Sequence, residues 1–301
     1  MTHGSSLRTP PRGRRRSETR PRVVSRAARV AGSVAVLLAA VGCWAAPDDG
    51  PDPTRGHDAE VTPPPTSGGL DYQLGGAYDP APGVTVVVRD STEEPAPGVY
   101  SVCYVNGFQT QPAEAETWLR ENPELVLHDS TGAVVDPAWP DEYVLDPRTP
   151  ENREGILAIV GPAIERCAAA GYRAVEIDNL DTFARFDALS EDGNLALATA
   201  YADLAHQLGL AVGQKNAAEA AASARGAVGF DFAVTEECFA FGECTAYTDA
   251  YGEHVLQVEY ADSLAVPFAE VCASPDRAPL VVLRDRGLVP AGVAGHVEER
   301  C

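Results

Sequence analysis

The sequence has little basic charge outside its first residues, and it contains a single lysine. Its 301 residues include 44 Asp and Glu against 23 Lys and Arg, a formal net charge of −21. Positions 1–43 hold nine of the basic residues and one of the acidic ones, so the remainder has 14 basic and 43 acidic residues, or −29. This scarcity argues against a nucleic-acid partner, because phosphate binding needs clustered Lys and Arg. The acidic excess fits a cationic substrate, or solubility and salt tolerance alone.

Several common motifs are missing as well. Neither G-x-G-x-x-G nor G-x-x-x-x-G-K occurs, which disfavours a nucleotide-binding, doubly wound sheet. Neither C-x-x-C nor H-x-x-x-H occurs, which disfavours a metal site. We therefore predict no metal and no cofactor.

The N-terminal segment predicts export. An Arg-rich stretch precedes the apolar run Val30–Gly42, which is too short to span a bilayer comfortably, so residues 1–42 are predicted to be a signal peptide. Ala40-Val41-Gly42-Cys43 resembles a bacterial lipobox, which implies cleavage before Cys43 and a lipid on its sulfur. The alternative is ordinary cleavage near Ala46. The protein is thus expected either on the outer face of the cell membrane as a lipoprotein, touching the membrane only through its lipid, or secreted.

The segment that follows is predicted to be a disordered linker. Residues 43–69 are rich in Pro, Asp and Gly and show no apolar period. The body, residues 70–301, has six cysteines, and an even number in an exported chain suggests disulfides. Six cysteines allow 15 pairings. Of these we expect Cys103–Cys167, Cys238–Cys244 and Cys272–Cys301.

From residue 70 onward, short apolar runs alternate with Ala-rich helical stretches. Strands are predicted over Asp71–Leu74, Val84–Arg89, Val99–Asn106, Ala174–Asp178, Ala211–Lys215, Phe230–Glu236, His254–Glu259 and Leu280–Arg284. Helices are predicted over Ala113–Glu121, Glu151–Ala170, Gly193–Leu208, Ala217–Arg225, Ala246–Tyr251 and Leu264–Cys272. This alternation predicts a single (β/α)8 TIM barrel, with an open doubly wound sheet as the alternative.

Charged residues stand at the ends of several predicted strands, where a barrel gathers its functional groups. In the strand Ala174–Asp178, alternation places Glu176 and Asp178 on one face, which is the barrel mouth if the apolar residues face the helices. Other strands end in Lys215-Asn216, Glu236-Glu237 and Glu259-Tyr260. Converging buried charges are costly as mere structure. A pair of carboxylates flanking a sugar bond is the usual equipment of a glycosidase, one acting as acid and the other as nucleophile or base.

Six short segments carry a resemblance to a known family. They are Tyr72-Gln73-Leu74, Cys103-Tyr104-Val105-Asn106, Glu176-Ile177-Asp178-Asn179, Gly213-Gln214-Lys215-Asn216, Glu236-Glu237-Cys238 with Cys244, and Val258-Glu259-Tyr260. In this order they resemble glycoside hydrolase family 114, a group of TIM-barrel endo-α-1,4-polygalactosaminidases, over about residues 70–285. Thr235 and Leu70-Asp71 depart from the pattern, since the family often has Asn and Trp at those places. These departures concern subsites more than the reaction.

The resemblance implies a substrate of α-1,4-linked galactosamine that is partly or wholly de-N-acetylated. Such a cationic amino-sugar polysaccharide matches the acidic body. The resemblance also implies that Asp178 and Glu236 are the catalytic carboxylates. We assign Asp178 as nucleophile and Glu236 as general acid/base of a retaining mechanism.

Further substrate contacts follow from position along the strands. Glu176, Glu259 and Asp90 are expected to bind sugar ammonium groups, and Tyr72, Tyr104 and Tyr260 either stack on sugar faces or pack the barrel. Lys215 is expected to keep a mouth carboxylate ionised, with Asn179 and Asn216 as sugar contacts. Trp118 and Trp139 are expected either to stack against sugar rings or to pack in the helix layer.

Two other functions stay open from the sequence. The barrel and its two carboxylates fit a hydrolase of another amino-sugar glycan, and the cleft alone fits a catalytically silent sugar-binding lipoprotein. A monomer is expected.

Overall fold

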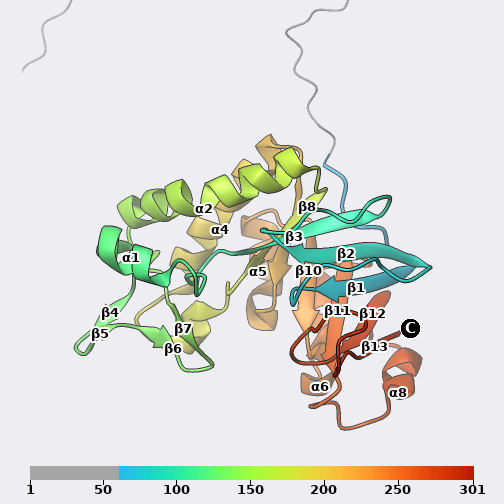
Figure 1. Cartoon of the computed structure of the whole chain (residues 1–301). Coiled ribbons are helices and arrows are strands. Elements are labelled where there is room, and N and C mark those ends of the chain that lie inside the picture. Colours follow the sequence, from blue (N-terminus) through green and yellow to red (C-terminus); the bar gives the residue numbers. More distant parts are fainter. Residues whose placement is uncertain (1–60) are drawn as a thin grey trace, which may run out of the picture. The chain divides into compact units, whose positions relative to one another are not determined.

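The main sheet contains eight parallel strands in chain order, and it curls on itself. In this computed structural model, which describes residues 61–301, the strands are β1 (Gly69–Gln73), β2 (Val84–Asp90), β3 (Tyr100–Asn106), β8 (Ala174–Asp178), β9 (Ala211–Lys215), β10 (Phe232–Glu236), β11 (Val255–Tyr260) and β12 (Leu280–Arg284). A short ninth strand, β13 (Glu298–Arg300), runs antiparallel to β12. Because β12 also packs against β1, the sheet forms a barrel (Figure 1). The predicted TIM-barrel fold is confirmed.

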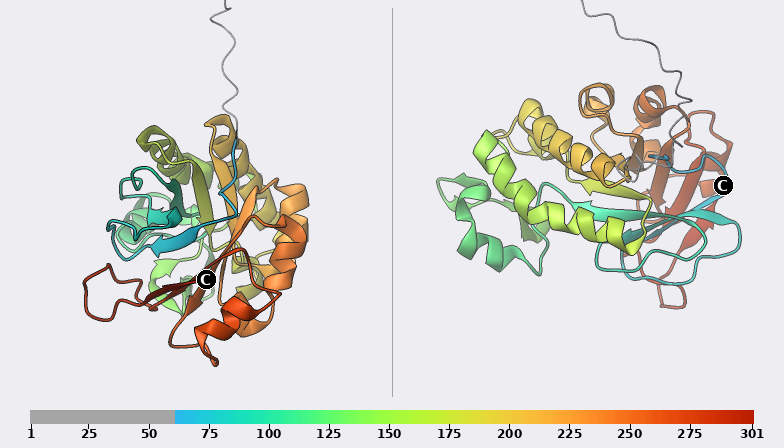
Figure 2. Two further views of the ribbon diagram at one scale, coloured as in Figure 1. Left: turned by 90° about the vertical axis from the view of Figure 1, so that its right-hand side faces the viewer. Right: turned by 90° about the horizontal axis from the view of Figure 1, so that it is seen from above.

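Helices cover the outer face of part of this sheet. The helices of the described residues are α1 (Ala115–Glu121), α2 (Pro150–Ala170), α3 (Thr182–Arg185), α4 (Glu191–Gln207), α5 (Ala221–Ala227), α6 (Cys238–Phe241), α7 (Cys244–Tyr251) and α8 (Phe268–Ala273), with 3-10 turns at Pro123–Leu125 and Ala218–Ala220. The helix α2 packs on β3 and β8, α4 on β8 and β9, and α7 on β10 and β11 (Figure 2).

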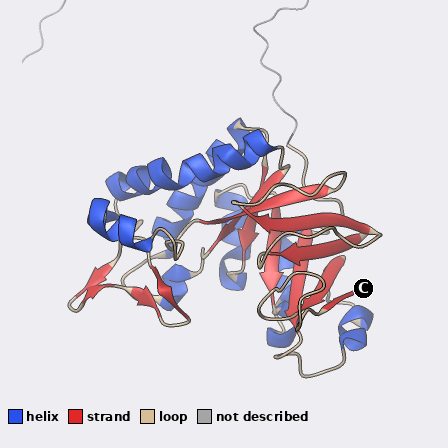
Figure 3. Cartoon of the chain, in the orientation of Figure 1, coloured by secondary structure: helices blue, strands red, loops and turns tan. Residues whose placement is uncertain are grey.

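The first two strand connections contain no helix, which departs from a regular (β/α)8 barrel (Figure 3). The sequence explains this. Residues 74–83 contain Pro80 and Pro82 with three glycines, and residues 91–99 contain Pro95 and Pro97. Proline removes a backbone donor and clashes with the preceding turn, so these segments form loops.

Two small antiparallel hairpins lie between α1 and α2, and the sequence did not predict them. They are β4 (His128–Asp129) with β5 (Gly132–Ala133), and β6 (Val135–Asp136) with β7 (Trp139–Tyr143). The backbone of Gln109, just after β3, forms an isolated bridge with Val144, just after β7. The second hairpin is thereby tied to the mouth of the barrel.

The long helix α2 shows how local sequence sets an element. The hydroxyl of Thr149 accepts a hydrogen bond from the backbone of Asn152, and Pro150 occupies the first turn, where its missing N–H costs nothing. Gly171 ends the helix with a φ of 97°, a left-handed conformation that suits glycine. Ile156 and Ile164 are fully buried and face the sheet.

The apolar core has two layers separated by the sheet. Leu70, Tyr72, Ala174 and Phe232 belong to the cluster inside the barrel. Residues alternating with them along the strands, such as Val175 and Ile177, belong to the cluster beneath the helices. This alternation directs Glu176 and Asp178 into the barrel.

Three disulfides join Cys103 to Cys167, Cys238 to Cys244 and Cys272 to Cys301, the same pairing that the sequence analysis expects. The predicted signal peptide, Cys43 and most of the predicted linker lie outside the described residues. The described part of that linker contacts the barrel: Val61 packs against the inner cluster, and the Tyr100 hydroxyl donates to the carbonyl oxygen of Thr62. Within residues 61–301, no helix combines the length and the apolar character needed to cross a bilayer.

The Cys103–Cys167 bond ties β3 to α2 across 64 residues of sequence, and it predicts a measurable share of stability. Replacing both cysteines by alanine should lower the free energy of unfolding by about 2–4 kcal/mol, chiefly because the unfolded chain regains the freedom of that loop. Urea titration of the purified body measures this difference. A double variant as stable as the parent would contradict the expectation.

Candidate active site

A cavity of about 460 Å³ opens at the C-terminal ends of the barrel strands. The ends of β3, β8, β9, β10 and β11 contribute Tyr104, Asp178, Lys215, Glu236 and Tyr260 to its lining. Five of the residues predicted from strand ends therefore meet in one place. This is the edge at which parallel barrels position reactive groups.

Lys215, the single lysine of the chain, lies at the base of the cavity with 2% of its side chain exposed. Its ammonium nitrogen is 3.0 Å from Glu176 Oε1, 3.2 Å from Glu236 Oε2 and 3.6 Å from Asp178 Oδ1. It also donates a hydrogen bond of 2.9 Å to the Tyr72 hydroxyl, which in turn donates to Glu176 at 2.8 Å. One cation thus holds three carboxylates together.

The electrostatics of Lys215 and Glu176 are coupled by burial. Desolvation alone would lower the pKa of Lys215, but the charges of Asp178, Glu236 and Glu176 outweigh it and hold that pKa well above its usual range. Burial raises the pKa of Glu176 to about 7 despite the attraction of Lys215, and Asp178 adds to the rise. Lys215 is therefore a stable cation in this site.

A glycine on β9 makes room for the charged cluster. Gly213 pairs with Glu176 on β8 and with Phe232 on β10. A Cβ atom at position 213 would come within 2.5 Å of the Phe232 ring. Only glycine fits there without displacing the inner core beneath Lys215.

Glu236 is held from both sides at the end of β10. Its Oε2 accepts from the Asn216 side-chain amide at 3.2 Å, its Oε1 accepts from the Tyr260 hydroxyl, and its backbone N–H donates to Asn216 Oδ1 at 2.8 Å. Asn216 was expected to contact a sugar hydroxyl. The structure instead commits its amide to Glu236, which makes Asn216 a positioning residue, although it still borders the cavity.

Asp178 is oriented by the neighbouring strand. Its Oδ2 accepts from the Tyr104 hydroxyl at 2.6 Å. The side chains of Asp178 and Glu236 are 18% and 24% exposed, so both reach the cavity. Since Asp178 Oδ1 and Glu236 Oε2 face the same nitrogen at 3.6 and 3.2 Å, these two oxygens are no further apart than the sum, 6.8 Å.

The chain turns sharply directly after three of these strands. Asn179, Asn216 and Glu237 have φ angles of 65°, 47° and 61°. Asparagine tolerates this left-handed region better than most residues, which accounts for two of the three positions. The turn leaves Asp178 and Glu236 as the last strand residues, projecting into the cavity.

The rim of the cavity is built by residues that strand-end reasoning did not find. Asp181, Arg185 and Arg286 come from loops and from α3, and Glu142 comes from the hairpin strand β7. None of them lies in a predicted strand, and no motif marked them. Trp139, singled out by its residue type alone, is 59% exposed beside the cavity, whereas Trp118 is buried in the helix layer.

Four predicted substrate contacts do not reach the cavity. Tyr72 and Glu176 have no exposed surface, because their side chains point into the barrel and bind Lys215 from below. Asp90 makes a turn with Thr92, whose backbone and hydroxyl donate to its Oδ1 at 2.9 and 2.6 Å, and it lines a separate groove beside α1 and α2. These three residues are corrections to the sequence-based assignment.

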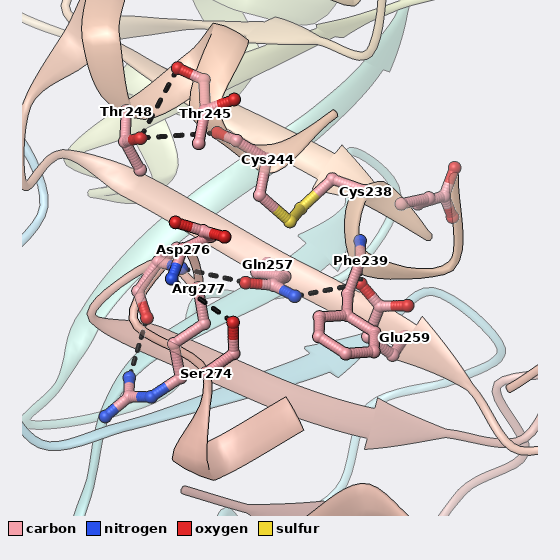
Figure 4. Close-up of a disulfide and its surroundings, with 12 residues drawn as sticks. Cys238, Phe239, Cys244, Thr245, Thr248, Gln257, Glu259, Ser274, Asp276 and Arg277 are labelled. Carbon is pink, nitrogen blue, oxygen red and sulfur yellow. Dashed lines mark hydrogen bonds between the residues drawn. A yellow bond between two sulfur atoms is a disulfide. The ribbon is translucent and has the colours of Figure 1, made fainter. Parts of the chain in front are cut away.

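Glu259 is the fourth correction. It is fully buried, and its Oε1 accepts from the backbone of Phe239 and the amide of Gln257, both at 2.9 Å (Figure 4). It therefore anchors the loop that follows Glu236. Cys238 and Cys244 lie close enough to Glu259 to suggest a metal site, but the disulfide leaves them no free thiolates.

The fold and the site together define a class of protein: a barrel with two adjacent, cavity-exposed carboxylates at its mouth is the arrangement of a glycosidase. The chain belongs to glycoside-hydrolase family GH114, whose family model matches residues 51–301. It is therefore a glycosidase, and the predicted family is confirmed.

A solved structure shows the same fold. Ega3 of Aspergillus fumigatus, in a complex with galactosamine, is 18% identical, with 80% of this chain and 98% of that chain covered and a TM-score of 0.63. The glycoside hydrolase domain of PelA from Pseudomonas aeruginosa is 16% identical, with 75% and 98% covered and a TM-score of 0.49. No curated protein sequence matches the chain.

The position of Lys215 predicts a strong and pH-dependent effect on stability. Lys215→Met should lower the free energy of unfolding at neutral pH by about 3–5 kcal/mol, because Glu176 would be buried without a cation. The loss should be smaller near pH 5.5 than near pH 8, since protonation of Glu176 removes the unpaired charge.

Urea titrations across this pH range measure the effect, with Lys215→Met/Glu176→Gln as the matched double variant. The double variant should recover part of the stability and lose the pH dependence. A single variant with the same deficit at both pH values would contradict the pairing.

Proposed function

We propose that this protein is an exported hydrolase that cleaves an α-1,4-linked, partly de-N-acetylated galactosamine polymer, with Asp178 as nucleophile and Glu236 as general acid/base. The observation that carries the proposal is the convergence of these two carboxylates on one cavity. The family membership, the galactosamine bound by Ega3 and the net charge of −29 on residues 44–301 support a cationic amino-sugar substrate.

The proposed reaction has two steps. Asp178 attacks the anomeric carbon while Glu236 gives its proton to the departing glycosidic oxygen, which forms a glycosyl ester on Asp178 and frees one polymer fragment. Water, deprotonated by Glu236, then displaces the ester and releases the second fragment, and Glu236 regains its proton.

Charge and separation favour these roles. Three carboxylates around one ammonium carry a net charge of −2 when all are ionised, which favours one retained proton in the cluster. The Tyr104 hydroxyl donates to Asp178 Oδ2 at 2.6 Å, and the Lys215 ammonium lies 3.6 Å from Asp178 Oδ1, so both oxygens of the proposed nucleophile are held in place. The bound of 6.8 Å on the distance between Asp178 Oδ1 and Glu236 Oε2 is compatible with the carboxyl separation of about 5–5.5 Å typical of retaining enzymes.

Substitution of either carboxylate tests this proposal. Asp178→Asn and Glu236→Gln should each lower kcat on deacetylated polygalactosamine by at least about 10³-fold, because each removes a group that forms or breaks a bond in the proposed reaction. Release of short oligomers measures the activity, with Glu253→Gln, an exposed residue before β11, as the control.

Proton NMR of the wild-type reaction should show the α-anomer as the first product. A β-anomer as the first product would indicate an inverting mechanism. Cleavage of other amino-sugar glycans only would contradict the proposed substrate, and binding without cleavage would identify a sugar-binding protein instead.

Export rests on the sequence, because Cys43 lies outside the described residues. We propose lipidation of Cys43, with the linker joining the anchored cysteine to the catalytic barrel. In a bacterial host, the wild-type protein should fractionate with membranes, and Cys43→Ala should appear in the soluble or secreted fraction. Mass spectrometry of the mature N-terminus checks the lipid. An unmodified N-terminus near Ala46 would support free secretion.

A further inference from the structure

One carboxylate of the cavity wall has no cation to balance it. Asp178 and Glu236 face Lys215, and Asp181 is 3.1 Å from Arg185. Glu142 also lines the cavity, but among the described residues it forms no ion pair, and its Oε2 accepts only a hydrogen bond of 3.0 Å from the Asn106 amide. Among the described residues, Glu142 is therefore a carboxylate whose negative charge no cation directly balances.

The surroundings of Glu142 make its negative charge more costly. Burial, together with the charges of Asp178 of β8 and Asp136 of β6, raises its pKa to about 7 against the opposing effects of the Asn106 amide and Arg185 of α3. The Arg185 guanidinium is already engaged by Asp136, Asp181 and Asn179. A cation arriving from solvent would thus be the first direct charge partner of Glu142.

The opposite wall of the cavity carries a cation with its charge already matched. Arg286 lies over the Tyr260 ring at 4.1 Å and binds Glu237 at 2.8 Å and Asp262 at 2.9 Å. Unbalanced negative charge is therefore concentrated on the Glu142 side. Trp139, from the same hairpin strand, is also exposed and lines the cavity.

We propose that Glu142 binds the ammonium group of the galactosamine residue that lies beside Asp178, and that it makes the enzyme select a free amine over an N-acetyl group at that position. The inference rests on the proposed function, and it identifies one residue that determines which form of the substrate is selected. An N-acetyl group carries no charge, so it would leave Glu142 unbalanced and forfeit a charge-assisted hydrogen bond. Below about pH 7, binding of the ammonium would also expel a proton from Glu142.

Steady-state kinetics on fully deacetylated and fully N-acetylated galactosamine oligomers test this assignment. Glu142→Gln should raise KM for the deacetylated oligomers by about 10- to 100-fold, with little change in kcat and less than about twofold change for the acetylated ones. Glu142→Asp should restore part of the loss. Asp141→Asn, an exposed neighbour outside the cavity, is the control for charge and folding.

The pH profile supplies a second readout that a merely structural role would not move. For the wild type, KM for the deacetylated oligomers should fall from about pH 5.5 to about pH 7 as Glu142 ionises, and Glu142→Gln should lose this trend. Calorimetry with Glu236→Gln, in buffers of different ionisation enthalpy, should detect the expelled proton and lose it when Glu142→Gln is added.

The outcomes separate this inference from the function beneath it. A wild type that cleaves the deacetylated oligomers while Glu142→Gln leaves KM unchanged, or raises it equally for both oligomers, overturns the role of Glu142 and leaves the proposed function intact. A wild type that neither binds nor cleaves either oligomer overturns both. Selective loss for the deacetylated oligomers, rescued by aspartate, establishes the assignment.

Discussion

The buried ammonium group of Lys215 is the interaction on which the site depends. It comes from β9, the strand between the two that carry Asp178 and Glu236, and it touches both carboxylates together with Glu176 beneath them. Without this cation, three acidic groups would face one another in a space with little water. Two further residues support this arrangement. Gly213 leaves room for the Phe232 ring beneath Lys215, and the Tyr72 hydroxyl bridges Lys215 to Glu176. The geometry of the proposed reacting pair is therefore fixed from inside the barrel.

The barrel interior and the rim contribute different parts of the site. Strand ends hold the proposed reacting groups, and sharp turns at Asn179 and Asn216 keep those groups at the edge of the sheet. The rim comes from segments outside the barrel strands, above all the β6–β7 hairpin and the loop carrying Arg286. Such segments change shape and charge at little cost to the core, which suits them to choosing among related sugars.

The strands were predictable because each is a short apolar run. Five of the eight begin and end at the residues expected, or differ by one residue at one end: Val84–Asp90, Tyr100–Asn106, Ala174–Asp178, Ala211–Lys215 and Leu280–Arg284. The same reasoning placed Asp178, Lys215 and Glu236 in one site. It failed for Glu176 and Glu259. Strand alternation shows that a charged residue faces inward, but it does not show whether the side chain reaches the cavity or lies buried below it. It missed Glu142 because a two-strand hairpin outside the barrel leaves no periodic signal, and its approach to Asn106 depends on tertiary contacts.

If the chain is exported as proposed, its three disulfides differ in when they become possible during transfer across the membrane. Cys238 and Cys244 are separated by six residues and can join as soon as their segment emerges, whereas Cys272 must wait for Cys301, beyond every other cysteine. If translocation proceeds from the N-terminal side, the loop behind Glu236 is closed covalently before β13 can dock against β12. The catalytic loop would thus be locked early, and attachment of the final strand would seal a barrel whose reactive centre is already in place.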